Sequence, residues 1–154
     1  MKPLFVLVGL MLATPAVAQD SWVTSVLFID GECRKLLVGD EDLQPICGKQ
    51  IMQAIHSDGR VELMVPTEDD DDRFFVFIGQ RQGSEGDWPL VQDISEIVVG
   101  LDTMGERQKT YRASGQCTHE DVYAGPARFT CAMTGSAGRA YEFVFVSDGN
   151  APET

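Results

Sequence analysis

Several patterns that mark catalytic and ligand-binding sites are missing from this sequence. It has no serine in a G-x-S-x-G turn, no H-E-x-x-H zinc motif and no glycine-rich loop of the kind that holds phosphate. It contains two histidines, His56 and His119, so few side chains could transfer protons near neutral pH. The sequence favours no enzyme class, and we expect a protein that is not an enzyme and needs no cofactor.

Positive charge is also scarce. The 154 residues include 12 Lys and Arg against 24 Asp and Glu, which gives a formal net charge of −12 at pH 7. Binding of nucleic acid depends on basic side chains that contact phosphate groups. We therefore expect no nucleic-acid partner, and a surface that attracts a cationic protein or envelope component.

No apolar run is long enough to cross a bilayer as a helix. The longest extends from Leu4 to Ala13, about ten residues where about 20 are needed. Lys2 precedes it and the triplet Ala16-Val17-Ala18 follows, which is the layout of a secretory signal peptide. We predict cleavage after this triplet, so that residues 1–18 are a signal peptide and residues 19–154 form one domain, without a membrane span, in the periplasm or outside the cell.

The four cysteines are interpreted in that oxidising compartment, where disulfides persist. Thirteen residues separate Cys33 from Cys47, and thirteen separate Cys117 from Cys131. Structural zinc sites bring cysteines together at spacings of about two to four residues, and redox-active pairs need C-x-x-C, so neither pattern fits. We favour the two sequential disulfides, each worth roughly 3 kcal/mol. Crossed pairings, free thiols and metal binding remain alternatives.

Alternation with a period of two dominates the rest of the chain. Short runs rich in β-branched and aromatic residues are bounded by turn residues: SWVTSVLFID, RVELMV, RFFVFIG, ISEIVVGL, RQKTYRA, RFTCAM and AYEFVFV. Turns are expected at Asp30-Gly31, Met104-Gly105 and Gly135-Ser136-Ala137-Gly138. We predict an all-β single domain of eight or nine short antiparallel strands, arranged as a sandwich or a small barrel.

One segment could be a helix or a strand. In GKQIMQAIHSDG, Ile51, Met52 and Ile55 could share one face of a helix. We favour a strand, because Ser57-Asp58-Gly59 leads directly into RVELMV, as the turn of a hairpin does.

A duplicated meander is a further hypothesis. RVELMV followed by RFFVFIG resembles RFTCAM followed by AYEFVFV, and a competing register pairs GEC at Gly31–Cys33 with GQC at Gly115–Cys117. The seam would lie in Gly79–Gln92, a polar, glycine-rich segment that we predict to be a long surface loop without strands.

Five successive carboxylates form the strongest local signal: Glu68, Asp69, Asp70, Asp71 and Asp72. They are weak candidates for calcium binding, because calcium takes oxygen ligands. The spaced D-x-D-x-D-G pattern is missing, and charge runs ordinarily stay in water. We favour a solvated hairpin loop and assign no metal site.

Two single residues are weighed as site candidates. His119 stands beside Glu120 and Asp121 in THED, but neighbours in sequence rarely converge on one point, so we assign it no catalytic role. Trp88, in GDWP, either packs inward over the edge of the core or stands out as a partner-binding residue. We favour inward packing and keep partner binding as the alternative.

The carboxyl-terminal quarter of the chain reads YRASGQCTHEDVYAGPARFTCAMTGSAGRAYEFVFVSDG. It resembles a group of small secreted or periplasmic bacterial proteins of uncharacterised activity. The shared elements are a G-x-C strand, a G-x-P turn, a second cysteine and a closing aromatic strand before D-G. In this sequence they fall on Gly115 to Cys117, Gly125 to Pro126, Cys131, Phe143 to Val146 and Asp148-Gly149. The resemblance implies export and a strand-built fold, and it implies no activity.

Three functional hypotheses follow from the sequence. The first is an exported binding domain whose acidic surface steers a cationic partner toward it, with inhibitor-like binding of a basic enzyme as one version. The second is an envelope structural or stress protein with weak divalent-cation binding. The third is a hydrolase that uses His119 with nearby carboxylates.

Overall fold

The computed structural model describes residues 20–68, 73–84, 86–101 and 107–154, and these contain no α-helix. The strands and the single 3₁₀ turn are β1 (Val23–Val38), β2 (Glu41–Asp42), η1 (Gln44–Ile46), β3 (Gln50–His56), β4 (Arg60–Pro66), β5 (Phe74–Gln82), β6 (Leu90–Gly100), β7 (Gln108–His119), β8 (Arg128–Gly135) and β9 (Ala140–Ser147). The predicted all-β fold is confirmed.

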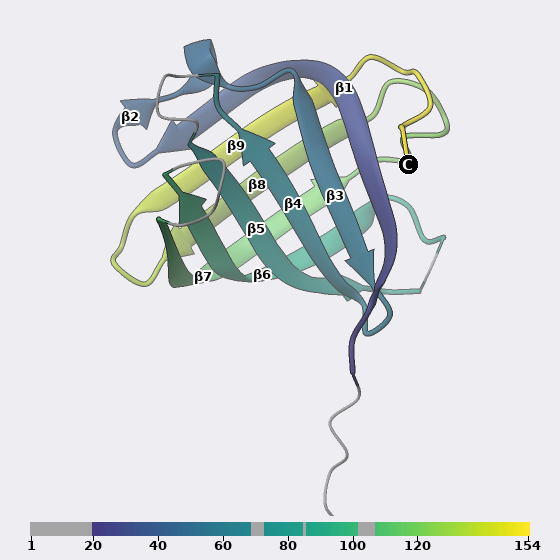
Figure 1. The fold of residues 1–154 in the computed structure, drawn as a ribbon, viewed down its shortest axis with the longest axis horizontal. Coiled ribbons are helices and arrows are strands. Elements are labelled where there is room, and N and C mark those ends of the chain that lie inside the picture. Colours follow the sequence, from purple (N-terminus) through teal and green to yellow (C-terminus); the bar gives the residue numbers. More distant parts are fainter. Residues whose placement is uncertain (1–19, 69–72, 85, 102–106) are drawn as a thin grey trace, which may run out of the picture.

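Eight of the strands form a closed antiparallel barrel (Figure 1). From β3 to β9 each strand pairs with the next one along the chain, and β1 pairs with both β3 and β9. The short β2 adds to the carboxyl end of β1. Of the two arrangements expected from the sequence, the structure is the barrel.

The first strand changes partner at Gly31. Residues before Gly31 pair with β3, and residues from Gly31 onward pair with β9. A Cβ atom on Gly31 would lie 2.2 Å from the carbonyl oxygen of Val146, so only glycine allows the two backbones to approach this closely. The turn predicted at Asp30-Gly31 is therefore wrong: the glycine permits a close strand crossing inside β1.

The interior of the barrel is filled by side chains at alternating strand positions. Four phenylalanines are fully buried: Phe77, Phe129, Phe143 and Phe145. The rings of Phe77 and Phe143 lie 6.0 Å apart between centroids, and those of Phe143 and Phe145 lie 6.2 Å apart. Eight strands enclose a space that side chains can fill, which explains why the middle of this barrel is solid.

Three sequence predictions about local structure can now be assessed. The segment Gln50–His56 is strand β3, and it pairs with β4 as the predicted hairpin. The turn at Gly135–Gly138 joins β8 to β9, as expected. The prediction that Gly79–Gln92 has no strands is wrong, because β5 continues to Gln82 and β6 begins at Leu90. Met104-Gly105 lies outside the described residues.

Both sequential disulfides are present. Cys33 is bonded to Cys47 with a Cα–Cα distance of 5.9 Å, which ties the η1 segment to β1. Cys117 is bonded to Cys131 at 4.0 Å, and the two residues face each other across β7 and β8. These bonds are consistent with an oxidising compartment. In the part of the chain that the structure describes, no helix has the length and hydropathy needed to span a bilayer.

The burial of these bonds leads to a prediction about thiol chemistry. All four cysteines are at most 7% exposed, so native protein is expected to react with a thiol reagent at none of them until it is denatured and reduced. Replacing Cys33 and Cys47 together by alanine is expected to lower the free energy of unfolding by about 3 kcal/mol in chemical denaturation. Reactive thiols in the native protein would contradict the assignment.

Candidate interaction surface

The outside of the barrel is apolar across several neighbouring strands. Alternate residues of each strand point inward. In β4, Val61 and Leu63 point inward and are completely buried, whereas Glu62 and Met64 point outward and are half-buried. The register then aligns one row of outward side chains from β1 to β6: Phe28, Met52, Met64, Val76 and Val98. We call this row, with its flanking Ala54 and Ile78, the outer apolar face.

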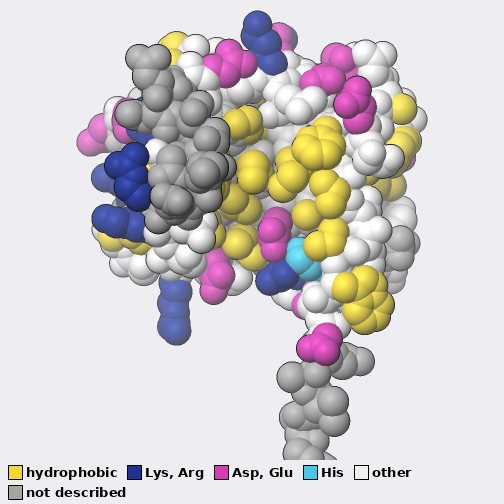
Figure 2. Space-filling model, in the orientation of Figure 1, with side chains coloured by type: hydrophobic (Ala, Val, Ile, Leu, Met, Phe, Trp, Pro, Cys, Tyr) yellow, Lys and Arg dark blue, Asp and Glu magenta, His cyan; other side chains and the backbone are white. Residues whose placement is uncertain are grey.

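Figure 2 shows hydrophobic side chains gathered on this side of the molecule, over β3 to β5. Phe28 is 38% exposed at one end of the row, and Val76 and Ala54 are 8% and 5% exposed. The other members, Met52, Met64, Ile78 and Val98, are half-buried. The register makes these side chains neighbours across the strands, so they form one apolar face. Surfaces of this kind commonly mark sites of interaction.

Closure of the barrel does not by itself require an apolar exterior. On β7 and β8 the outward positions are polar or small: Thr110, Arg112, Ser114, Gln116, Thr118, Thr130, Ala132 and Thr134. The two sides of the same barrel thus differ in chemistry. The sequence signal for this was the uninterrupted run Phe74–Ile78, since consecutive apolar residues in a strand make both of its faces apolar. We used that run only to predict a strand.

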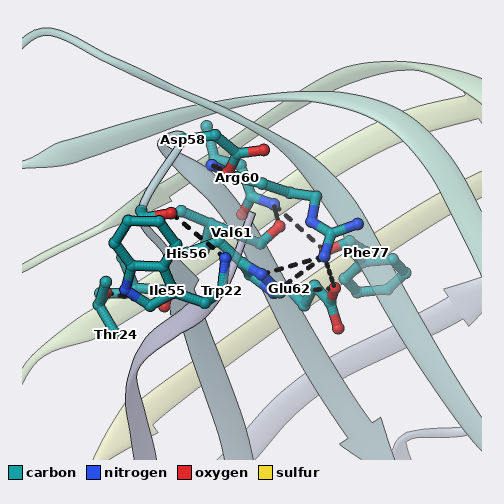
Figure 3. Close-up of polar contacts among 11 residues, drawn as sticks. Trp22, Thr24, Ile55, His56, Asp58, Arg60, Val61, Glu62 and Phe77 are labelled. Carbon is teal, nitrogen blue, oxygen red and sulfur yellow. Dashed lines mark hydrogen bonds and ion pairs between the residues drawn. The ribbon is translucent and has the colours of Figure 1, made fainter. Parts of the chain in front are cut away.

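A polar cluster borders the outer apolar face at the β3–β4 turn (Figure 3). His56 Nε2 lies 3.0 Å from Glu62 Oε1, and Arg60 Nη2 lies 3.0 Å from His56 Nδ1. A neutral imidazole that donates from Nε2 and accepts at Nδ1 satisfies both contacts. The side chain of His56 is only 6% exposed, and the cluster contributes one carboxylate and one guanidinium.

The other histidine lies inside the barrel. His119 Nδ1 is 2.6 Å from Gln53 Nε2, its ring packs 5.0 Å from that of Phe129, and its Nε2 has no partner among the described residues. Burial lowers the pKa of His119 to about 3, so the ring is neutral at pH 7. Its polar partner is the side-chain amide of Gln53.

The THED motif is not assembled into one site. Glu120 Oε2 accepts a hydrogen bond from the backbone N–H of Arg128, and Asp121 Oδ1 accepts one from the N–H of Tyr123. Both carboxylates therefore shape the β7–β8 loop and do not contact the imidazole of His119.

His119 also lies beside the second disulfide. A ring nitrogen and the sulfurs of Cys117 and Cys131 are within 4.8 Å of one another. Because the sulfurs are bonded to each other, neither is a thiolate that could bind a metal ion. The neighbours of His119 thus support a role in packing.

The remaining site candidates are on the surface or outside the described residues. Trp88 is 43% exposed, so our expectation of inward packing is wrong and the residue remains a candidate for partner binding. Glu68 is exposed, and its backbone N–H donates to the carbonyl of Ile46 at 2.7 Å. Asp69, Asp70, Asp71 and Asp72 lie outside the described residues.

Comparison with known proteins adds no relative: no protein-family model, no curated protein and no solved structure matches this chain.

The buried His119 predicts a specific pH dependence of stability. Its pKa is about 3 in the folded protein, against the ordinary histidine value of 6.5, so below pH 6.5 the unfolded chain binds the proton more readily. The contribution of the neutral ring is complete above pH 6.5 and is lost as pH falls toward 3, at up to about 1.4 kcal/mol per pH unit. A His119→Gln variant has no imidazole to protonate at this position. Its free energy of unfolding, relative to that of the native chain, should therefore increase as the pH is lowered from 7 to 4.5.

Chemical denaturation of both proteins at several pH values measures this difference and cancels the contribution of the carboxylates they share. A difference in unfolding free energy that stays constant from pH 7 to pH 4.5 would contradict a buried neutral imidazole.

Proposed function

We propose that the protein is an exported, non-enzymatic interaction domain that binds a protein partner through the outer apolar face. The observation that supports this most is the contrast between the apolar row on β1 and β3 to β6 and the polar exterior of β7 and β8. An apolar centre surrounded by polar residues is the usual composition of a binding surface. Its methionines, Met52 and Met64, are flexible side chains that adapt to the shape of a partner.

The charge distribution favours a cationic partner. The chain carries a formal net charge of −12, whereas the cluster of His56, Arg60 and Glu62 beside the face is balanced in charge. Long-range attraction would then speed the encounter, and burial of the apolar row would set the lifetime of the complex. Inhibitor-like binding of a basic secreted enzyme is one version of this function.

Site-specific crosslinking in intact cells tests the assignment of the face. A photoreactive phenylalanine analogue at Met64 lies in the middle of the apolar row, and the same group at Thr130 lies on the polar exterior of β8 and serves as the matched control. We expect illumination to give a defined adduct from position 64 and none from position 130. Adducts of equal yield at both positions, or none at position 64, would contradict the proposal.

A charged substitution on the face provides a quantitative prediction once the crosslinked partner is identified. Met64→Asp places an unpaired carboxylate where the partner would exclude water, and we expect binding to weaken by about 30-fold, or about 2 kcal/mol. Thr130→Asp adds the same charge on the control side and should leave the dissociation rate unchanged. Surface plasmon resonance should also show that salt lowers the association rate more than it raises the dissociation rate. Equal effects of the two substitutions would contradict binding through this face.

A further inference from the structure

A hollow opens at the end of the barrel where β2 lies. Its main cavity has a volume of about 220 Å³. The apolar and aromatic wall comes from strands that meet at this end: Val38 of β1, Phe75 of β5, Val99 of β6, Tyr111 of β7 and Tyr141 of β9. The rings of Phe75 and Tyr141 meet edge to face, 6.5 Å apart between centroids. Since Val38, Phe75 and Tyr141 are buried residues of the core, the hollow lies directly against the core of the barrel.

A missing side chain on β8 enlarges the hollow. The inward position of β8 at this end is Gly135, and beside it a second cavity of about 150 Å³ shares Tyr111, Arg139 and Tyr141 with the first. The atoms nearest to a Cβ on Gly135 would be Tyr141 Cε2 at 3.4 Å, Arg139 O at 3.7 Å and Arg112 O at 3.9 Å, so a Cβ atom would be in ordinary contact there. The fold therefore does not require glycine at position 135, and the glycine leaves the second cavity open.

Cations outnumber acids around the main cavity, in contrast to the chain as a whole. Arg73, Lys109 and Arg139 line it, together with a single acid, Glu41. Arg73 Nη1 lies 3.4 Å from Glu41 Oε1, whereas neither Lys109 nor Arg139 forms an ion pair with any residue that the structure describes. Figure 2 shows Lys and Arg side chains gathered at the left, which is the end that bears β2 in Figure 1.

The tyrosines add neutral hydroxyl groups to this charged rim. Burial raises the pKa of Tyr141, while the nearby Arg139 acts in the opposite direction. A phenol that stays protonated at pH 7 can donate a hydrogen bond to an anion. The wall therefore combines apolar surface at its base, guanidinium and ammonium groups at its rim, and a hydroxyl donor close to Arg139.

We propose that this hollow binds a small amphipathic anion: a carboxylate or similar acidic head group held by Lys109 and Arg139, with a short apolar body against Val38, Phe75 and Val99. The charge of the rim selects the head group, because these cations gain a partner when the ligand binds. The volume limits the body, since a cavity of about 150 Å³ holds one benzene ring and drug-sized ligands need about 300 Å³ or more. This site lies at the end of the barrel and is distinct from the outer apolar face.

Calorimetric titration with octanoate and octanamide tests the proposal, because the two probes share their chain and differ in charge. At pH 7.5 and low salt we expect octanoate to bind in a one-to-one ratio, at least about tenfold more tightly than octanamide. Arg139→Gln should weaken octanoate binding by about tenfold and leave octanamide nearly unchanged. Arg34→Gln is the matched control, because Arg34 pairs with Glu32 outside the hollow and its side chain is 56% exposed.

Two further variants keep the test independent of any one substitution. Lys109→Gln removes the second rim cation and should act like Arg139→Gln. Gly135→Val fills the second cavity and should weaken both probes without altering the preference for the anion. Near-ultraviolet circular dichroism confirms that each variant is folded. No binding of octanoate, equal affinity for the two probes, or an equal loss in the Arg34→Gln control would overturn the proposal.

Discussion

The whole structure depends on one strand that pairs with two partners. β1 joins β3 through its first half and β9 through its second half, and this closes β1 and β3 to β9 into a barrel, with the short β2 added at the carboxyl end of β1. Closure encloses the phenylalanines of the core and directs alternate residues outward. Gly31 makes the change of partner possible, because the backbone of β9 leaves no room for a side chain there.

Closure also determines where the two proposed sites lie. Strands β3 to β9 each pair with a neighbour on both sides, so both proposed sites use side chains on the exterior or at the end of the barrel and not its strand edges. The outer apolar face uses the exterior of β1 and of β3 to β6, and the hollow uses the end of the barrel beside Lys109 and Arg139. The first combines an apolar surface with overall negative charge, and the second combines apolar walls with local positive charge, so the two suit ligands of opposite charge.

Local features of this fold could be predicted from the sequence, whereas long-range ones could not. Ser57-Asp58-Gly59 indicated a hairpin, and the equal spacing of the cysteines indicated two short disulfide loops, because both depend on residues close together in the chain. The register of β1 against β9 joins residues more than a hundred positions apart, and a period of two contains no information about it. The exposure of Trp88 was predicted wrongly, and the convergence of Lys109 and Arg139 on one cavity was missed, for the same reason: exposure and convergence are properties of the assembled barrel.

Amide hydrogen exchange along β1 is the most direct measurement of this constraint. We expect the amides of residues 31–38 that point toward β9 to exchange as slowly as those between β8 and β9, since both sets lie inside a continuous sheet. If these amides and those of β9 that face β1 instead exchange as fast as amides of an unpaired edge strand, the sheet is open. That result would contradict the barrel and the sites that the barrel positions.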